Sequence, residues 1–135
     1  MTDPQETSLP PYAGGTVELA RLIRGHALRM VHAANASHIG GALSMSDVLA
    51  VLYAETLRVR PAEPQWAGRD RFILSKGHCC SVLYAALAVR GFFPVEKLQT
   101  HYQDGSDLSG HVSHKGIPGV ELSTGSPGHG LPVAV

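Results

Sequence analysis

The junction between residues 71 and 78 constrains the fold of this chain more than any other stretch. A short apolar run, Arg71–Leu74, leads into Ser75-Lys76-Gly77-His78, and an apolar segment with helical spacing follows from Cys79 to Arg90. A buried strand, a glycine turn and a helix in this order are typical of α/β proteins, which present their sites at the carboxyl edge of a parallel sheet. The sequence therefore predicts an α/β fold with short parallel strands and mostly buried helices.

Helical periodicity accounts for much of the remaining chain. The spacing predicts a helix over 16–34, capped by Thr16, and a second helix that begins at Ser44. The second helix is apolar on nearly every side, so we expect it to be deeply buried. The other predicted features are a C-terminal cap at Gly91, a short helix over 94–101, a second strand over 119–122 and the start of a helix over 131–135.

The length, composition and charge of the chain exclude several classes of protein. The chain has 135 residues, 44% of them hydrophobic, and its 11 basic residues balance its 11 acidic ones. That balance argues against a nucleic-acid binder that relies on bulk charge, while it leaves room for a local anion site. No apolar run approaches the roughly 20 residues of a membrane helix, and the two cysteines are adjacent, which suits a reducing compartment. We therefore expect a cytoplasmic domain over 16–135, preceded by a flexible arm over 1–15, with neither nucleic acid nor membrane as a partner.

Glycine-flanked histidines occur in three loops, each between apolar elements. They are His38, beside Gly40-Gly41, His78 after Gly77, and His111 after Gly110. The start of a helix offers free backbone N–H groups and a partial positive charge, which favour phosphate and should lower the pKa of His78. A neutral imidazole donates one hydrogen bond and accepts another, and it exchanges protons near neutral pH. We expect the three rings to converge on one pocket, although each histidine taken singly has the alternative of a surface or structural residue.

A zinc site is another possible use of these side chains. The candidate ligands are His101, His111, His114, Cys79 and Cys80. Their spacing matches neither C-x-x-C nor H-E-x-x-H, and adjacent cysteines in a helix point to different faces. The turn Gly125–Gly130 likewise lacks the Gly-Lys-Ser/Thr of a phosphate-binding loop and does not match the dinucleotide fingerprint. The spacing therefore favours no metal ligand in this chain, and it favours small core residues at the two cysteines.

Four segments, in order along the chain, resemble motifs of the N-terminal thiamine-diphosphate-binding domain of transketolase. The most specific is Arg69-Asp70-Arg71-Phe72-Ile73-Leu74-Ser75-Lys76-Gly77-His78, which is similar to R-D-R-F-V-L-S-x-G-H. The others are Ser37–Met45, similar to S-G-H-P-G-x-x-x-G/S-M; Ser109-Gly110-His111, similar to the G-H of the next loop; and Pro118–Gly130, similar to P-G-V-E-x-T-T-G-x-L-G-Q-G. His129 in place of the family's glutamine, followed by Leu131-Pro132, resembles the split form, in which the N- and C-terminal subunits are separate chains. The resemblance covers residues 16–135.

The resemblance implies a fold, a reaction and a set of site residues. It implies an incomplete thiamine-diphosphate-binding fold that takes part in moving a two-carbon ketol unit from a ketose to an aldose. Catalytic roles are implied for His38, His78 and His111, of which the first and last would face substrate oxygens. Contacts with thiamine diphosphate are implied for His78, Gly125, Ser126, Pro127 and His129; Pro127 stands where the family often has leucine.

The resemblance also implies components that these 135 residues lack. The family holds Mg²⁺ and the diphosphate through a segment downstream of the last motif, and a second domain supplies a glutamate that activates the cofactor. We therefore expect metal ligands outside this chain, a transketolase C-terminal subunit as partner, sugar phosphates as substrates and a homo- or hetero-oligomer. We expect the chain alone to be inactive. Two alternatives stay open: a non-catalytic remnant or interaction module of the same fold, and an unrelated small α/β protein with a histidine-lined anion pocket.

Overall fold

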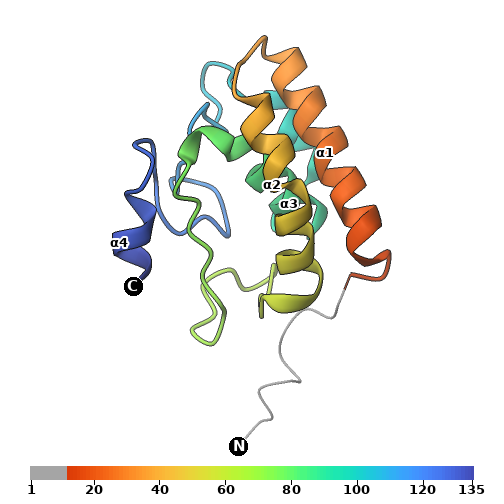
Figure 1. Cartoon of the computed structure of the whole chain (residues 1–135), viewed down its shortest axis with the longest axis vertical. Coiled ribbons are helices and arrows are strands. Elements are labelled where there is room, and N and C mark those ends of the chain that lie inside the picture. Colours follow the sequence, from red (N-terminus) through yellow and green to blue (C-terminus); the bar gives the residue numbers. More distant parts are fainter. Residues whose placement is uncertain (1–11) are drawn as a thin grey trace, which may run out of the picture.

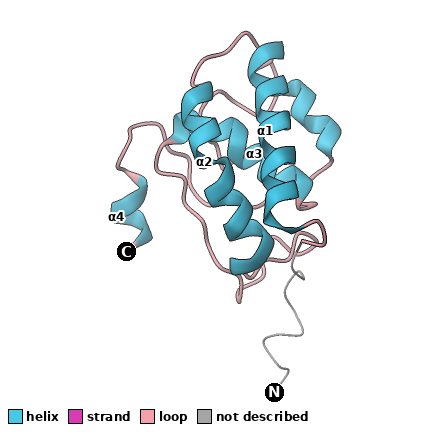
Figure 2. Ribbon diagram, turned by 45° about the vertical axis from the view of Figure 1, so that its right-hand side comes forward, coloured by secondary structure: helices cyan, strands magenta, loops and turns pink. Residues whose placement is uncertain are grey.

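A computed structural model describes residues 12–135 as a helical bundle with long loops on one side (Figure 1). Residues 1–11 of the predicted arm lie outside the described residues. The elements, in chain order, are α1 (Gly15–Ala33), α2 (Ile39–Val51), the π-helical turn η2 (Leu52–Thr56), the 3-10 turn η3 (Gly77–Cys79), α3 (Cys80–Val89), the 3-10 helix η4 (Val95–Thr100) and α4 (Gly130–Ala134). The short α4 stands apart from the bundle of α1, α2 and α3 in both views (Figures 1 and 2).

Helix α3 forms the centre of the core. Every residue from Cys80 to Ala88 is buried, and Tyr84, Leu83 and Leu87 are its largest buried side chains. Burying one such side chain contributes about 2 kcal/mol, so this helix organises the packing of α1, α2 and η4 around it. The predicted cap at Gly91 is confirmed, because this residue has φ +87° and the Phe92 N–H donates to the carbonyl of Leu87.

Helix α1 turns its predicted apolar stripe toward α3 and α2. Leu19, Ile23, Ala27 and Met30 are buried along it, at the spacing of one helix face. The expected cap at Thr16 is wrong, since the helix begins one residue earlier and has no side-chain cap. On the outer side, Arg24 forms an ion pair with Asp47 of α2 and so ties the two helices together.

The start and burial of α2 differ from the prediction. The helix begins at Ile39, five residues before the expected cap Ser44, whose hydroxyl instead donates to the carbonyl of Gly41 within the helix. The two glycines have low helix propensity and therefore suggested a break. The expected deep burial is also wrong in part, since Val48 and Val51 are 50% and 47% exposed.

No strand is present in the part of the chain that the structure describes, which corrects the predicted strands over 71–74 and 119–122. Both segments lack the paired ladder of backbone hydrogen bonds that defines a strand. Single contacts hold the chain here instead: Thr124, two residues after the second segment, donates through its hydroxyl to the carbonyl of Leu74 and through its N–H to the carbonyl of Val112. An apolar run can predict that a segment is extended and half-buried. Whether that segment forms a strand depends on a second extended segment beside it, which the run itself does not reveal.

A largely buried ion pair joins Arg69, which lies just before the first segment, to Glu121 of the second. The Arg69 guanidinium lies 2.6 Å from the Glu121 carboxylate, and the two side chains are only 8% and 16% exposed.

Glu121→Ala is expected to lower the free energy of unfolding by about 3 kcal/mol, because it leaves the arginine charge buried without this partner. Denaturant titration of the chain measures the effect. The control Glu18→Ala, which breaks the exposed pair with Arg21, should change the stability little, because solvent screens that pair. Equal losses in the two variants would contradict this role for Glu121.

Candidate functional site

The three glycine-flanked histidines meet at one place on the surface of the bundle. The ring centroid of His38 lies 5.1 Å from that of His78 and 5.9 Å from that of His111. Together they border a shallow recess of about 50 Å³, which we call the histidine recess. It is lined by Val31, Ala36, Ser37, His38, His78, Cys80, Ser81, His101, Tyr102, Gly110 and His111. The expected convergence of the rings is therefore observed.

Three different local structures deliver these rings. His38 sits just before α2 in the left-handed conformation, with φ +72°. His78 lies in the 3-10 turn η3 that leads into α3, and His111 lies on the loop after Leu108. His38 and His111 are exposed, and His78 is half-buried, so a ligand can reach all three from solvent.

The backbone of the His111 loop is fastened to the buried helix α3. The Tyr84 hydroxyl donates to the carbonyl of His111 at 3.3 Å and accepts the N–H of Ser113 at 3.2 Å. The Cys80 thiol donates to the carbonyl of Ser109, and the Ser109 hydroxyl donates to that of His111. Sequence reasoning missed Tyr84, whose one signal was a hydroxyl within an otherwise apolar, buried helix. Such a hydroxyl needs a partner, and here the partner is the loop that carries His111.

The pKa of His78 lies below its ordinary value. Partial burial of the ring is the main cause, and the neighbouring His38, His111 and Lys76 each lower it further by electrostatic repulsion. The sequence predicted this direction but attributed it to the start of the helix, whereas the structure assigns it to desolvation and to the cationic neighbours. Neutral His78 can thus accept a proton, or donate a hydrogen bond, over a wider range of pH.

The glycine-rich turn over 125–130 approaches the His111 ring at its first residue, and none of its residues lines the recess itself. A Cβ placed on Gly125 would lie 3.9 Å from Cδ2 of His111, and it would meet nothing else within 4 Å. Ser126, Pro127 and His129 are exposed on the same turn. The Ser75 hydroxyl holds the turn in place by accepting the N–H groups of Gly128 and Gly130, both at 3.1 Å. Those two N–H groups are therefore engaged within the protein.

Two aromatic residues of the recess were not predicted as site residues. His101 is 4% exposed, and its Nδ1 donates to the carbonyl of Leu108, which can only accept. Burial lowers the pKa of His101, an effect that the hydrogen bond to Leu108 partly opposes. Tyr102, beside it, is 59% exposed. The sequence suggested His101 only as a zinc candidate, and Tyr102 carried no motif.

Residues 12–135 were compared with the requirements of a metal site and of a membrane-spanning helix. Within that range, no three or more His, Cys, Asp and Glu side chains are grouped so that they could hold a metal ion. Cys79 and Cys80 are both buried, and burial raises the pKa of Cys80 to about 12. None of the helices described there is long and apolar enough to cross a membrane.

Comparisons with known proteins agree on one family. Residues 16–135 match the family model described as "Transketolase, thiamine diphosphate binding domain". The chain is 46% identical over 112 residues to an apulose-4-phosphate transketolase subunit of Phocaeicola vulgatus, covering 83% of this chain and 40% of that protein. It is 41% identical over 116 residues to a 6-deoxy-6-sulfo-D-fructose transketolase subunit of Clostridium sp., covering 86% of this chain and 42% of that one.

Solved structures show the same relationship. Transketolase from Leishmania mexicana matches with a TM-score of 0.82 and 35% identity, covering 87% of this chain and 18% of that one. Transketolase from Pichia stipitis in complex with sedoheptulose 7-phosphate matches with a TM-score of 0.81 and 35% identity, covering 86% and 17%. The chain thus spans about 40% of the length of the curated subunits it resembles and less than a fifth of these full-length enzymes. The family model covers nearly the whole chain, and the chain accordingly belongs to the transketolase family, as part of its thiamine-diphosphate-binding domain.

Proposed function

We propose that this chain supplies the substrate-facing histidines of a two-part transketolase that moves a two-carbon ketol unit from a ketose to an aldose. Its relatives include proteins named as transketolase subunits, which supports a partner-dependent role. The partner would be a C-terminal transketolase subunit, and the substrates would be sugar phosphates. The observation that carries the proposal is the meeting of His38, His78 and His111 at one recess in a chain of this family.

The residues around the recess fit the oxygen-rich parts of thiamine diphosphate and of a sugar. Imidazole N–H groups donate to anionic and carbonyl oxygens, and the Lys76 ammonium, close to His78 in the sequence, adds positive charge. Beside His111, Gly125 leaves open space where any larger residue would place a side chain. In the proposal, His78, Gly125, Ser126, Pro127 and His129 line the cofactor, while Mg²⁺ is held by residues outside those described.

When bound, thiamine diphosphate supplies the electron sink that allows a carbon–carbon bond next to a carbonyl to break and form. The chain's own residues contribute position and proton transfer. His38 and His111 hold the hydroxyl and carbonyl oxygens of the sugar by donating hydrogen bonds. His78, kept neutral by its surroundings, takes up or returns a proton at an oxygen of the reacting end.

Reconstitution with a transketolase C-terminal subunit tests this proposal. Thiamine diphosphate and Mg²⁺ are titrated into the chain alone and into the mixture, and sedoheptulose 7-phosphate is then supplied with glycolaldehyde as acceptor. We expect the five-carbon aldose phosphate and a four-carbon ketose to appear only in the mixture, and thiamine diphosphate to bind the mixture at least tenfold more tightly, because the missing ligands are then present. Full activity of the chain alone would contradict the partner requirement. An assembly that binds the cofactor without transferring the ketol unit would support a non-catalytic module instead.

A further inference from the structure

Tyr102 occupies a backbone conformation that is unfavourable for its residue type. Only three non-glycine residues among those described have positive φ: Asn35 at +48°, His38 at +72° and Tyr102 at +61°. Asparagine tolerates this region, whereas a bulky aromatic residue does so at a cost. His38 and Tyr102 both line the histidine recess. Unfavourable backbone of this kind persists where the surroundings enforce it, and it clusters at functional sites.

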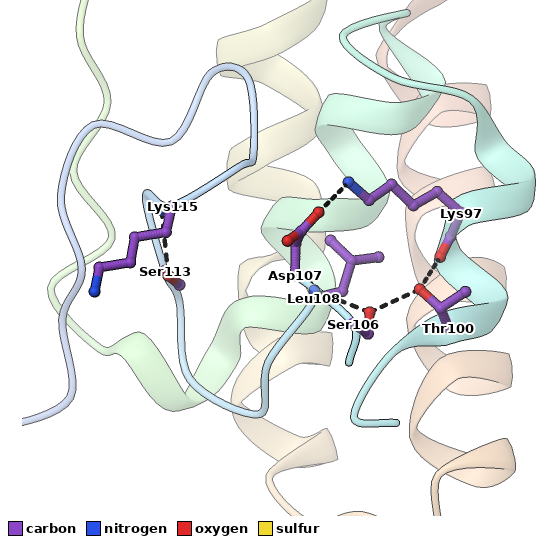
Figure 3. Close-up of polar contacts among 7 residues, drawn as sticks. All are labelled: Lys97, Thr100, Ser106, Asp107, Leu108, Ser113 and Lys115. Carbon is purple, nitrogen blue, oxygen red and sulfur yellow. Dashed lines mark hydrogen bonds and ion pairs between the residues drawn. The ribbon is translucent and has the colours of Figure 1, made fainter. Parts of the chain in front are cut away.

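Backbone and loop contacts around Tyr102, rather than its own side chain, hold this residue in its positive-φ conformation. Its N–H donates to the carbonyl of Leu108 at 2.8 Å, and the Leu108 N–H donates to the Ser106 hydroxyl. Ser106 in turn hydrogen-bonds Thr100 of η4 at 2.7 Å (Figure 3). Lys97, also on η4, pairs with Asp107 on the same loop at 2.8 Å. Two adjacent residues of the loop, Ser106 and Asp107, are therefore bound to η4, and Leu108 after them accepts the Tyr102 N–H.

The ring of Tyr102 is positioned by a close approach to the loop that carries His111. A Cβ added to Gly110 would lie 1.8 Å from Cε2 of Tyr102, so the ring packs directly on the glycine backbone. The ring also contacts buried His101, with 6.0 Å between centroids. Even so, the side chain remains 59% exposed at the edge of the recess. An exposed aromatic ring that is fixed at the edge of a polar recess is suited to packing on a ligand.

We propose that Tyr102 is a specificity-determining residue, whose ring packs against the carbon chain of the sugar held by His38, His78 and His111. This inference rests on the proposed ketol transfer and deepens it. The hydrogen bonds to the histidines orient the oxygens of the substrate, and the ring contributes an apolar surface beside them. The ring face, and not the hydroxyl, makes the contact, because no described hydrogen bond orients that hydroxyl toward the recess.

The test uses the chain assembled with its C-terminal subunit, thiamine diphosphate and Mg²⁺, and sedoheptulose 7-phosphate as the probe ketose. Tyr102→Gly removes the ring and relieves the backbone, so we expect its melting temperature to be no lower than that of the wild type. Loss of roughly 50 Å² of apolar contact should raise KM about tenfold, with a smaller change in kcat. Tyr102→Phe should keep KM within about twofold. The neighbouring exposed residue gives the control Gln103→Ala, for which KM should not change.

The outcomes separate this inference from the proposed function. An active wild-type assembly in which Tyr102→Gly leaves KM unchanged overturns the role of Tyr102 and leaves ketol transfer standing. A tenfold higher KM in Tyr102→Phe as well overturns the assignment to the ring face. A wild-type assembly without ketol transfer overturns the proposed function, and the inference fails with it. If Tyr102→Gly lowers the melting temperature, lowers kcat and raises KM, the residue has a structural role instead.

Discussion

Replacing His78 with alanine is expected to lower kcat/KM for ketol transfer about 10²- to 10⁴-fold in the assembled enzyme, which is the usual contribution of a positioned acid or base. His78 lines the recess, 5.1 Å from His38 between ring centroids, and belongs to the turn into α3. His78 is half-buried at the surface of the bundle and is not among the buried core residues, so the variant should fold. Steady-state kinetics with sedoheptulose 7-phosphate measures the loss, and the melting temperature checks the fold.

His114 provides a matched control for this experiment. It is a histidine on the loop that carries His111, it is exposed, and its Nδ1 is within 2.7 Å of the Ser123 hydroxyl, away from the residues lining the recess. His114→Ala should leave kcat/KM within about twofold of the wild type, since no substrate contact is assigned to it. If His78→Ala and His114→Ala lost activity equally, the recess would not be the place where the chemistry occurs.

The pH profile of the wild type should carry the signature of His78. Its pKa is lowered below the ordinary value of 6.5, so the neutral form that accepts a proton persists as the pH falls toward that value. The acid limb of kcat/KM should therefore have its midpoint below pH 6.5, and activity should be lost only as the pH drops through the lowered pKa. The residual activity of His78→Ala should lack that limb; an identical limb in the variant would assign it to another group.

The convergence of the three histidines was predictable from the sequence. The contacts that hold their loops in place were not. Glycine-flanked histidines in three loops between apolar elements predicted one pocket, and His38, His78 and His111 do lie together. His38 and His78 stand at the starts of α2 and α3, whereas His111 lies on a loop that hydrogen bonds fasten to α3. The hydroxyl of Tyr84 and the left-handed backbone of Tyr102 leave no periodic trace in a sequence. Both depend on contacts with segments that are distant along the chain.

The helices were predicted better than the extended segments, for a physical reason. A helix satisfies its backbone within itself, so periodicity alone located α1 and α3 to within about two residues. A strand is completed by a neighbour, and the apolar run at 71–74 has no ladder partner among the described residues. The start of α2 was missed because Gly40-Gly41 suggested a break. Tertiary packing explains the second glycine, since a Cβ on Gly41 would lie 2.5 Å from Sγ of Cys79.

Gly77→Ala is expected to be among the most destabilising single substitutions in this chain, lowering the free energy of unfolding by about 3 kcal/mol. The added Cβ would lie 2.0 Å from the carbonyl oxygen of Thr124 and 2.5 Å from its carbonyl carbon. Because these are backbone atoms, no rotamer change can relieve the clash. Thr124 is itself held by hydrogen bonds to the carbonyls of Leu74 and Val112. The turn that presents His78 would therefore have to move away from the segment that leads into the Gly125 turn.

Gly40→Ala is the matched control for Gly77→Ala, because a Cβ at position 40 meets nothing within 4 Å and the residue is already helical. This variant should be neutral, or more stable by up to about 1 kcal/mol, from helix propensity alone. Denaturant titration of both variants as full chains compares them directly. Equal stability of Gly77→Ala and the wild type would mean that the segments carrying His78 and Gly125 are not held in contact. The Gly125 turn would then have no structural reason to lie beside the His111 ring.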